Sequence, residues 1–295
     1  MVARAQRWLV FAWLVAAVAW TAAWWSRSPA MAITGLLVLS GAHAVFLAFE
    51  FVLAWRVDGS DPLPRASGRQ FFKAWLAESI AAPRVFGWYQ PFRWGAIPDH
   101  LPQATRRGVV LVHGFVGNRA FWTPWLRELR AADRAFVAVD LEPVFGSIDR
   151  YVQTIDAAIV RVTAATGQPP LLICHSMGGL AARAGLRDAD GGRVHRIATL
   201  GTPHRGTWLA RFGRTANGRQ MRMGGEWLQR IDGERTSVRQ VPFSCWYSNS
   251  DNIVFPTSVA TLPGADNRLA AGRGHVELAF DAPVRREVLA LLDAT

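Results

Sequence analysis

The stretch PLLICHSMGGL, residues 170–180, decides the fold class of this 295-residue chain. A short apolar run is followed, with no loop between, by small residues that suit the start of a helix. This change predicts a buried strand, a sharp turn and a helix. Such a turn pushes the side chain at its tip outward, and small flanking residues let the strand and the helix approach closely. Ser176, at the tip, is therefore a candidate nucleophile.

The sequence on both sides of this stretch has a regular rhythm from Gly108 onward. Short apolar runs alternate with stretches of helical pattern, which is typical of βαβ units around a parallel sheet. Strands are predicted at 109–112, 135–140, 171–174, 194–200 and 243–247, with a further candidate within 92–97. Helices are predicted at 119–131, 148–165, 177–187 and 282–293. The pattern indicates an α/β fold with a doubly wound sheet covered on both faces.

Three segments carry a resemblance to the α/β-hydrolase family. CHSMG, residues 174–178, resembles the family's Gly-x-Ser-x-Gly elbow, with Cys174 at the first glycine position. VVLVHGF, residues 109–115, is similar to the strand and turn that supply half of the family's oxyanion hole. LGTPHRGT, residues 200–207, resembles the loop after the sixth strand of lipase-like members. The resemblance covers about residues 108–293 and implies the α/β-hydrolase fold with a mostly parallel sheet.

The resemblance also implies a histidine base. Ser176 would be the nucleophile, and a serine hydroxyl needs an adjacent imidazole to take its proton. The family's chain order of serine, acid and histidine leaves His195, His204 and His275. His275 lies in the glycine-flanked loop GRGHVE, residues 272–277, just before the last predicted helix. The family places its base there, so His275 is the predicted one.

The acid that orients the histidine should follow the strand predicted at 243–247. Asp251 lies in the polar segment SNSDNIV, residues 248–254, at the carboxyl end of that strand. Asp266 is the alternative, whereas Asp140 comes too early in the chain. The predicted catalytic set is therefore Ser176, Asp251 and His275. We expect no cofactor and no metal site.

Further site residues follow from the same resemblance. The backbone N–H groups of Phe115 and Met177 would form the oxyanion hole, and their side chains would either line an acyl pocket or pack in the core. His113, His175 and His204 are candidate pocket residues, with His113 assigned to the oxyanion turn and His204 to a loop or lid contact.

The segment 204–240 interrupts the alternation of strands and helices. It is rich in glycine and arginine and holds one apolar helix candidate at 225–231. The segment could be a lid over the site or irregular surface structure. Cys174 and Cys245 lie in apolar strand-like runs, where a free thiol packs as a small hydrophobe.

The first 56 residues predict a membrane hairpin. Only 19% of the chain is charged, against roughly 25% in an ordinary soluble domain. Residues 8–25 and 30–49 carry no Asp, Glu, Lys or Arg, and each run approaches the roughly 20 residues that cross a bilayer. The turn between them contains Pro29. The alternative is a cleaved signal peptide over residues 1–23.

The residues that flank the two runs predict an orientation. Tryptophans near the run ends suit the headgroup boundary. Arginines precede the first run and follow the second, so the positive-inside rule places both ends, and the catalytic domain, in the cytoplasm. His43 and Glu50 are the titratable groups of the second run, and Glu50 is expected to reach the membrane interface.

Residues 57–107 form a connector rich in proline, arginine and aromatic residues. A short helix at 71–80 could lie in the headgroup plane with Lys73 and Glu78 facing water. The same aromatic residues could instead cap the core of the domain that follows. The predicted organisation is thus a hairpin at 1–56, this connector, and a catalytic domain at 108–295.

The net charge of +11 suits either nucleic acid or an anionic membrane surface. The arginines are scattered and form no nucleic-acid motif, so the sequence favours the membrane. The leading hypothesis is a membrane-anchored serine hydrolase that cleaves carboxylic esters of acyl lipids. An acyltransferase or thioesterase with the same triad, and a membrane scaffold without catalysis, remain the alternatives.

Overall fold

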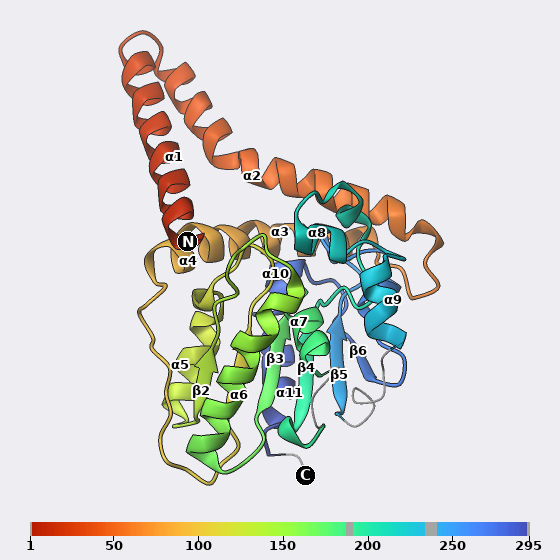
Figure 1. Cartoon of the computed structure of the whole chain (residues 1–295). Coiled ribbons are helices and arrows are strands. Elements are labelled where there is room, and N and C mark those ends of the chain that lie inside the picture. The colour runs from red at the N-terminus through yellow and green to blue at the C-terminus, as the bar shows by residue number, and fades with distance from the viewer. Residues whose placement is uncertain (1, 187–190, 234–240, 294–295) are drawn as a thin grey trace.

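The computed structural model describes residues 2–186, 191–233 and 241–293 (Figure 1). Two parts are visible: a set of N-terminal helices, and an α/β layer structure that follows in the chain. The last residue of the helix predicted at 177–187 and residues 234–240 of the candidate lid lie outside the described residues.

The centre of the α/β part is a parallel sheet with the strand order β2-β1-β3-β4-β5-β6 within the described residues. Its strands are β1 (Val109–Val112), β2 (Phe136–Ala138), β3 (Leu171–His175), β4 (Arg196–Leu200), β5 (Phe243–Tyr247) and β6 (Asp266–Leu269). The chain goes from β1 to one side for β2 and to the other side for β3. This reversal creates a crevice at the carboxyl ends of the strands, where sheets of this kind bind ligands.

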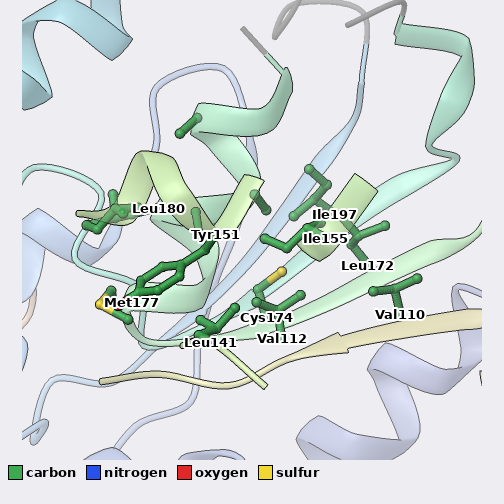
Figure 2. Close-up of a cluster of buried hydrophobic side chains, with 14 of the residues drawn as sticks. Val110, Val112, Leu141, Tyr151, Ile155, Leu172, Cys174, Met177, Leu180 and Ile197 are labelled. Carbon is green, nitrogen blue, oxygen red and sulfur yellow. The ribbon is translucent and has the colours of Figure 1, made fainter. Parts of the chain in front are cut away.

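Helices cover both faces of the sheet because the strand side chains alternate between them. Val110, Val112 and Leu172 join one buried cluster with α6 (Val152–Thr166) and α7 (Met177–Leu186), part of which is shown in Figure 2. Val109 and Leu111 join the other cluster, with α5 (Thr123–Ala131) and α11 (Ala282–Ala290). The strands are therefore buried on both sides, which is why they read as continuous apolar runs.

Further helical segments of the α/β part complete the two layers and the loops above them. They are η3 (Arg119–Trp122), α5 (Thr123–Ala131), η4 (Ile148–Tyr151), α6 (Val152–Thr166), α7 (Met177–Leu186), η5 (Gly191–Arg193), η6 (Trp208–Phe212), α8 (Ala216–Gln220), α9 (Glu226–Gly233), η8 (Thr257–Ala260), α10 (His275–Leu278) and α11 (Ala282–Ala290).

The N-terminal helices begin with the antiparallel pair α1 (Val2–Trp25) and α2 (Pro29–Val57). Ser28 caps α2 and Pro29 occupies its first turn, as helix starts favour. Both helices are long and apolar enough to cross a bilayer. Only 6% of the most apolar stretch of α1, and 11% of that of α2, is buried. The two charge-free runs thus form two long apolar helices, as predicted.

The two helices separate along their length. The indole of Trp13 donates to the carbonyl of Leu39 at 3.1 Å, but from His43 onward α2 packs against α3 (Gly68–Ala82). The second half of α2 consequently lies across the α/β part (Figure 1). The first turns of α1 lie against α4 (Gln90–Phe92), where the Gln6 side chain donates to the Gln90 side chain at 2.7 Å.

Residues 57–107 are largely helical, in η1 (Asp58–Ser60), α3, the π-helix η2 (Pro83–Tyr89) and α4. Val85 and Tyr89 pack into the core cluster of α5 and α11, so part of this aromatic segment does cap the α/β part. The candidate strand within 92–97 is wrong, because these residues end α4 and enter a turn. The strand β6 was not predicted, because its residues are polar and mostly exposed.

Candidate active site

Ser176 lies at the tip of the turn between β3 and α7, as the sequence predicts. Its φ of 53° is in the left-handed region, which is strained for any residue with a side chain. A Cβ on Gly178 would lie 2.6 Å from the carbonyl oxygens of Val112 and His113. Only glycine therefore lets the start of α7 approach β1 this closely. Strand, turn and helix together have the geometry of a nucleophile elbow.

Cys174 takes the first glycine position of the elbow without disturbing it. Its side chain is fully buried and points into the apolar cluster beneath α6 and α7 (Figure 2). Burial raises the pKa of this thiol far above its ordinary value, so the thiol stays protonated. Cys174 therefore acts as a small apolar residue.

His275 and Asp251 lie side by side at the same edge of the sheet. Asp251 follows β5, His275 starts α10, and Nδ1 of His275 is 2.8 Å from Oδ2 of Asp251. The other carboxylate oxygen accepts the N–H groups of Ile253 and Val254, both at 2.8 Å. Because both oxygens are engaged, the carboxylate is fixed and the imidazole carries its proton on Nδ1.

Burial and charge act in opposite directions on His275. Burial lowers the pKa of the imidazole, while the Asp251 carboxylate and, less strongly, Glu78 and Glu50 raise it. The charges win, and the pKa of His275 lies above its ordinary value. Asp266, the alternative acid, lies on β6 and pairs instead with Arg268 at 2.7 Å.

Ser176 and His275 line one cavity of about 300 Å³. Gly114 and Phe115, from the turn after β1, line it as well, and a Cβ on Gly114 would lie 2.8 Å from Cβ of Ser176. The turn after β1 thus lies directly against the serine. Met177 is buried in the core cluster, so of the two side chains named for the acyl pocket only that of Phe115 lines this cavity.

The three candidate pocket histidines have different environments. His175 lines the cavity, stacks on Phe121 with ring centroids 4.4 Å apart, and its Nε2–H donates to the carbonyl of His275 at 3.1 Å. His113 donates to the carbonyl of Gly114 and accepts the N–H of Leu141.

His204 is fully buried beside Thr199 and Cys245. Burial lowers the pKa values of all three histidines. His113 and His204 are not among the residues that line the cavity. Both are buried, and each forms a side-chain hydrogen bond to a neighbouring segment.

The N-terminal helices supply the other wall of the cavity. Their lining residues are Leu47, Glu50, Glu78, Ala82, Phe86 and Gln90. None of the described residues of the candidate lid, 204–233, lines the cavity. The N-terminal helices, and not the described part of the segment 204–240, therefore wall this side of the cavity.

One expectation about carboxylates is wrong, and a second carboxylate has contacts that the sequence did not predict. Glu78 does not face water: it is 2% exposed and accepts backbone N–H groups of α10. Glu50 lines the cavity and accepts the side-chain N–H of Asn252 at 2.8 Å. One signal for Glu78 is present in the sequence, because it shares a helix face with the apolar Phe71 and Ala74.

In the ranges that the structure describes, no group of three or more His, Cys, Asp or Glu side chains could hold a metal ion. The candidate site brings together a serine on a strained elbow, a histidine held by a carboxylate, and a backbone turn beside them. At the carboxyl edge of a parallel α/β sheet, this arrangement defines the class of α/β-fold hydrolases.

The chain belongs to the α/β hydrolase family, whose model matches residues 109–289, more than half of the chain. The fold predicted from the sequence is thereby confirmed. No curated protein matches the chain significantly. The N-terminal helices, including α2 and α3, lie outside the residues that the family model matches.

Solved structures support the same fold. The mature form of the lipase BlEst2 from Bacillus licheniformis has a TM-score of 0.58 at 17% identity, covering 66% of this chain and 95% of that chain. Its propeptide form has a TM-score of 0.57 at 18% identity, covering 67% and 52%. The product of the gene lin2722 from Listeria innocua has a TM-score of 0.51 at 14% identity, covering 64% and 95%. At these identities the likeness shows the fold alone.

Proposed function

We propose that this chain is a membrane-anchored serine hydrolase that cleaves carboxylic esters of acyl lipids. The observation that carries the proposal is that His275, which pairs with Asp251, lines the same cavity as Ser176. In this reaction class, serine, histidine and acid act as one unit.

Each of the site residues would have its own role in the reaction. His275 takes the proton of the Ser176 hydroxyl as its oxygen attacks the ester carbonyl carbon. Asp251 keeps the proton of His275 on Nδ1, which leaves Nε2 as the base, and it stabilises the imidazolium that forms. The backbone N–H groups of Phe115 and Met177 stabilise the oxyanion. The alcohol leaves with a proton from His275, and water then hydrolyses the acyl-enzyme by the same route.

The lipid substrate is supported by the surroundings of the cavity. Apolar residues of α2, α3 and η2 line it, and the outer faces of these helices expose large apolar side chains, among them Phe49, Leu76 and Ile80. Exposed apolar surface of this extent is typical of a membrane contact. Of the three solved structures compared above, the one with the highest TM-score is a lipase. By the positive-inside rule, the catalytic part would lie in the cytoplasm.

The Ser176→Ala variant tests this proposal in the full-length chain in detergent. We expect release of p-nitrophenol from short acyl esters to fall by about 10³-fold or more, because the nucleophile is removed. Labelling by a fluorophosphonate probe should also disappear. The Ser26→Ala variant, at the exposed turn between α1 and α2, is the matched control and should behave as wild type. Equal turnover in wild type and Ser176→Ala would rule out the assignment.

A further inference from the structure

The loop that carries His275 is held from four sides, and two of the holding residues come from the N-terminal helices. Asp251 holds the imidazole, and His175 donates to the backbone carbonyl of His275. The remaining contacts lead to Glu78 on α3 and Glu50 on α2. Neither glutamate belongs to the part of the chain that the family model matches.

Glu78 accepts the backbone N–H groups that directly follow His275. Its two oxygens lie 2.9 and 3.1 Å from the N of Val276, and Oε2 lies 2.9 Å from the N of Glu277. The packing is close as well, because a Cβ on Gly274 would lie 2.6 Å from Oε2 of Glu78. A shift of α3 would therefore move the segment that presents the imidazole.

Glu50 reaches the same residue through Asn252. Oε2 of Glu50 accepts the side-chain N–H of Asn252 at 2.8 Å, and Oδ1 of Asn252 accepts the backbone N–H of His275 at 3.1 Å. Asn252 is 1% exposed and directly follows Asp251. The amide is therefore fixed at both ends, and α2 is linked to the backbone of the base.

The position of Glu78 is unfavourable for stability alone. A buried carboxylate without an ion pair destabilises a fold, and in the described part of the chain Glu78 is held by N–H groups and pairs with no cation. Both glutamates also act on the imidazolium form of His275 by charge. The charged and titratable groups around this imidazole are Asp251, Glu78, Glu50 and His175, with Glu277 and its partner Arg273 next to them.

We propose that Glu78 and Glu50 are positioning residues of His275, so that the N-terminal helices complete the catalytic site instead of serving as an anchor alone. This proposal rests on the proposed hydrolase function. Glu50 neighbours the exposed Phe49 on α2, and Glu78 lies between the exposed Leu76 and Ile80 on α3. The helices that carry the outward apolar side chains therefore also hold the base.

The Glu78→Gln variant of the full-length chain in detergent is the primary test. Glutamine keeps the size of the side chain but replaces one acceptor oxygen by a donor that faces N–H groups. We expect kcat for p-nitrophenyl butyrate to fall by about 10- to 100-fold, as for a misplaced catalytic group, with little change in KM. The acid limb of the kcat/KM profile should move to lower pH, because a negative charge beside the imidazolium is lost.

Two comparisons separate positioning from general weakening. In a His275→Ala background, Glu78→Gln should have no further effect, since residues that act through one another are not additive. Glu226→Gln, which removes an exposed carboxylate at the start of α9, should leave kcat and the acid limb unchanged. If Glu78→Gln does not fold, Glu50→Gln serves as the second variant and should shift the acid limb in the same direction.

A titration followed by nuclear magnetic resonance of ¹⁵N-labelled histidine keeps this proposal separate from the hydrolase proposal. The resonance that His275→Ala removes reports the pKa of His275 whatever ester is cleaved, and Glu78→Gln should lower that pKa. If the wild-type protein showed no hydrolysis that depends on Ser176, the hydrolase proposal would be wrong. The titration would still show whether Glu78 and Glu50 affect the pKa of His275. Folded Glu78→Gln and Glu50→Gln variants with wild-type kcat and an unmoved His275 pKa would overturn the positioning role.

Discussion

The α/β part and the N-terminal helices bury their apolar residues in opposite ways. Each residue of β1 is fully buried, with α5 and α11 on one side and α6 and α7 on the other. In contrast, Trp8 and Leu37 of the two long helices are each 67% exposed. The α/β part buries its own apolar side chains, whereas the N-terminal helices leave many of theirs exposed. The exception is the inner side of α2 and α3, where Leu47, Phe51 and Ala74 are buried.

This difference indicates where the proposed catalytic and anchoring roles would meet. The N-terminal helices turn one side to the catalytic cavity and leave the other side apolar and exposed. If the catalytic role belonged to the α/β part alone, substitutions in the helices would affect only membrane contact. The predictions that follow, like those for Ser176 and Glu78 above, test that division.

The largest effect among these predictions is expected at the acid of the α/β part. In Asp251→Asn the amide cannot hold the imidazole of His275 in the same tautomer, so kcat should fall by about 10⁴-fold. Steady-state hydrolysis of a p-nitrophenyl ester measures the change. The matched control is Asp266→Asn, the alternative acid, which should keep kcat near the wild-type value because Asp266 pairs with Arg268. If Asp266→Asn lost activity and Asp251→Asn kept it, Asp266 would be the acid that orients His275.

A second comparison uses one glycine from each part. A Cβ in Gly178→Ala would meet two backbone carbonyl oxygens at 2.6 Å, so the variant should lose about 3 kcal/mol of unfolding free energy or fail to fold. A Cβ at Gly87, in the π-helix η2, would meet none of the described residues beyond its own helical turn within 4 Å. Gly87→Ala should therefore stay within about 1 kcal/mol of wild type, in the stabilising direction. Urea unfolding in detergent, followed by tryptophan fluorescence, measures both, and equal losses would contradict the packing difference.

Much of the α/β part could be predicted because its signals are local. A strand buried on both faces is a continuous apolar run, and an elbow needs small residues next to the serine, so β1, β3, β5 and Ser176 are readable. Asp251 and His275 came from chain order and resemblance, and the structure does pair them. The strand β6 escaped because it is polar and mostly exposed, so it lacks the apolar pattern.

The contacts that the sequence did not predict are those between distant parts of the chain. A single carboxylate at the end of an apolar run, such as Glu50, is typical of a residue at the headgroup boundary. Only the return of α2 over the α/β part brings it to Asn252, 202 residues further on. The contacts of Glu78 with α10 likewise span 198 and 199 residues. A hydrophobic pattern within a short stretch of sequence cannot predict a contact between residues so far apart in the chain.

The smallest of these effects is a pH dependence of stability that joins the two parts. Burial raises the pKa of Glu78 to about 7 from 4.5, although the N–H groups of Glu277 and Val276 act in the opposite direction. The folded chain therefore binds this proton more tightly than the unfolded chain. The resulting stabilisation is fully present below pH 4.5 and is lost as the pH rises through 7.

Glu78→Gln cannot titrate, so it isolates this contribution. The unfolding free energy of wild type relative to Glu78→Gln should fall by up to about 3 kcal/mol between about pH 4.5 and about pH 8. Urea midpoints of both proteins at several pH values in the same detergent measure it. A constant difference would show that the carboxylate is already ionised at the acid end of this range in the folded chain, and the site would then hold a permanent charge beside His275. A falling difference would mean that α3 delivers its full negative charge to the base only as the pH rises through neutrality.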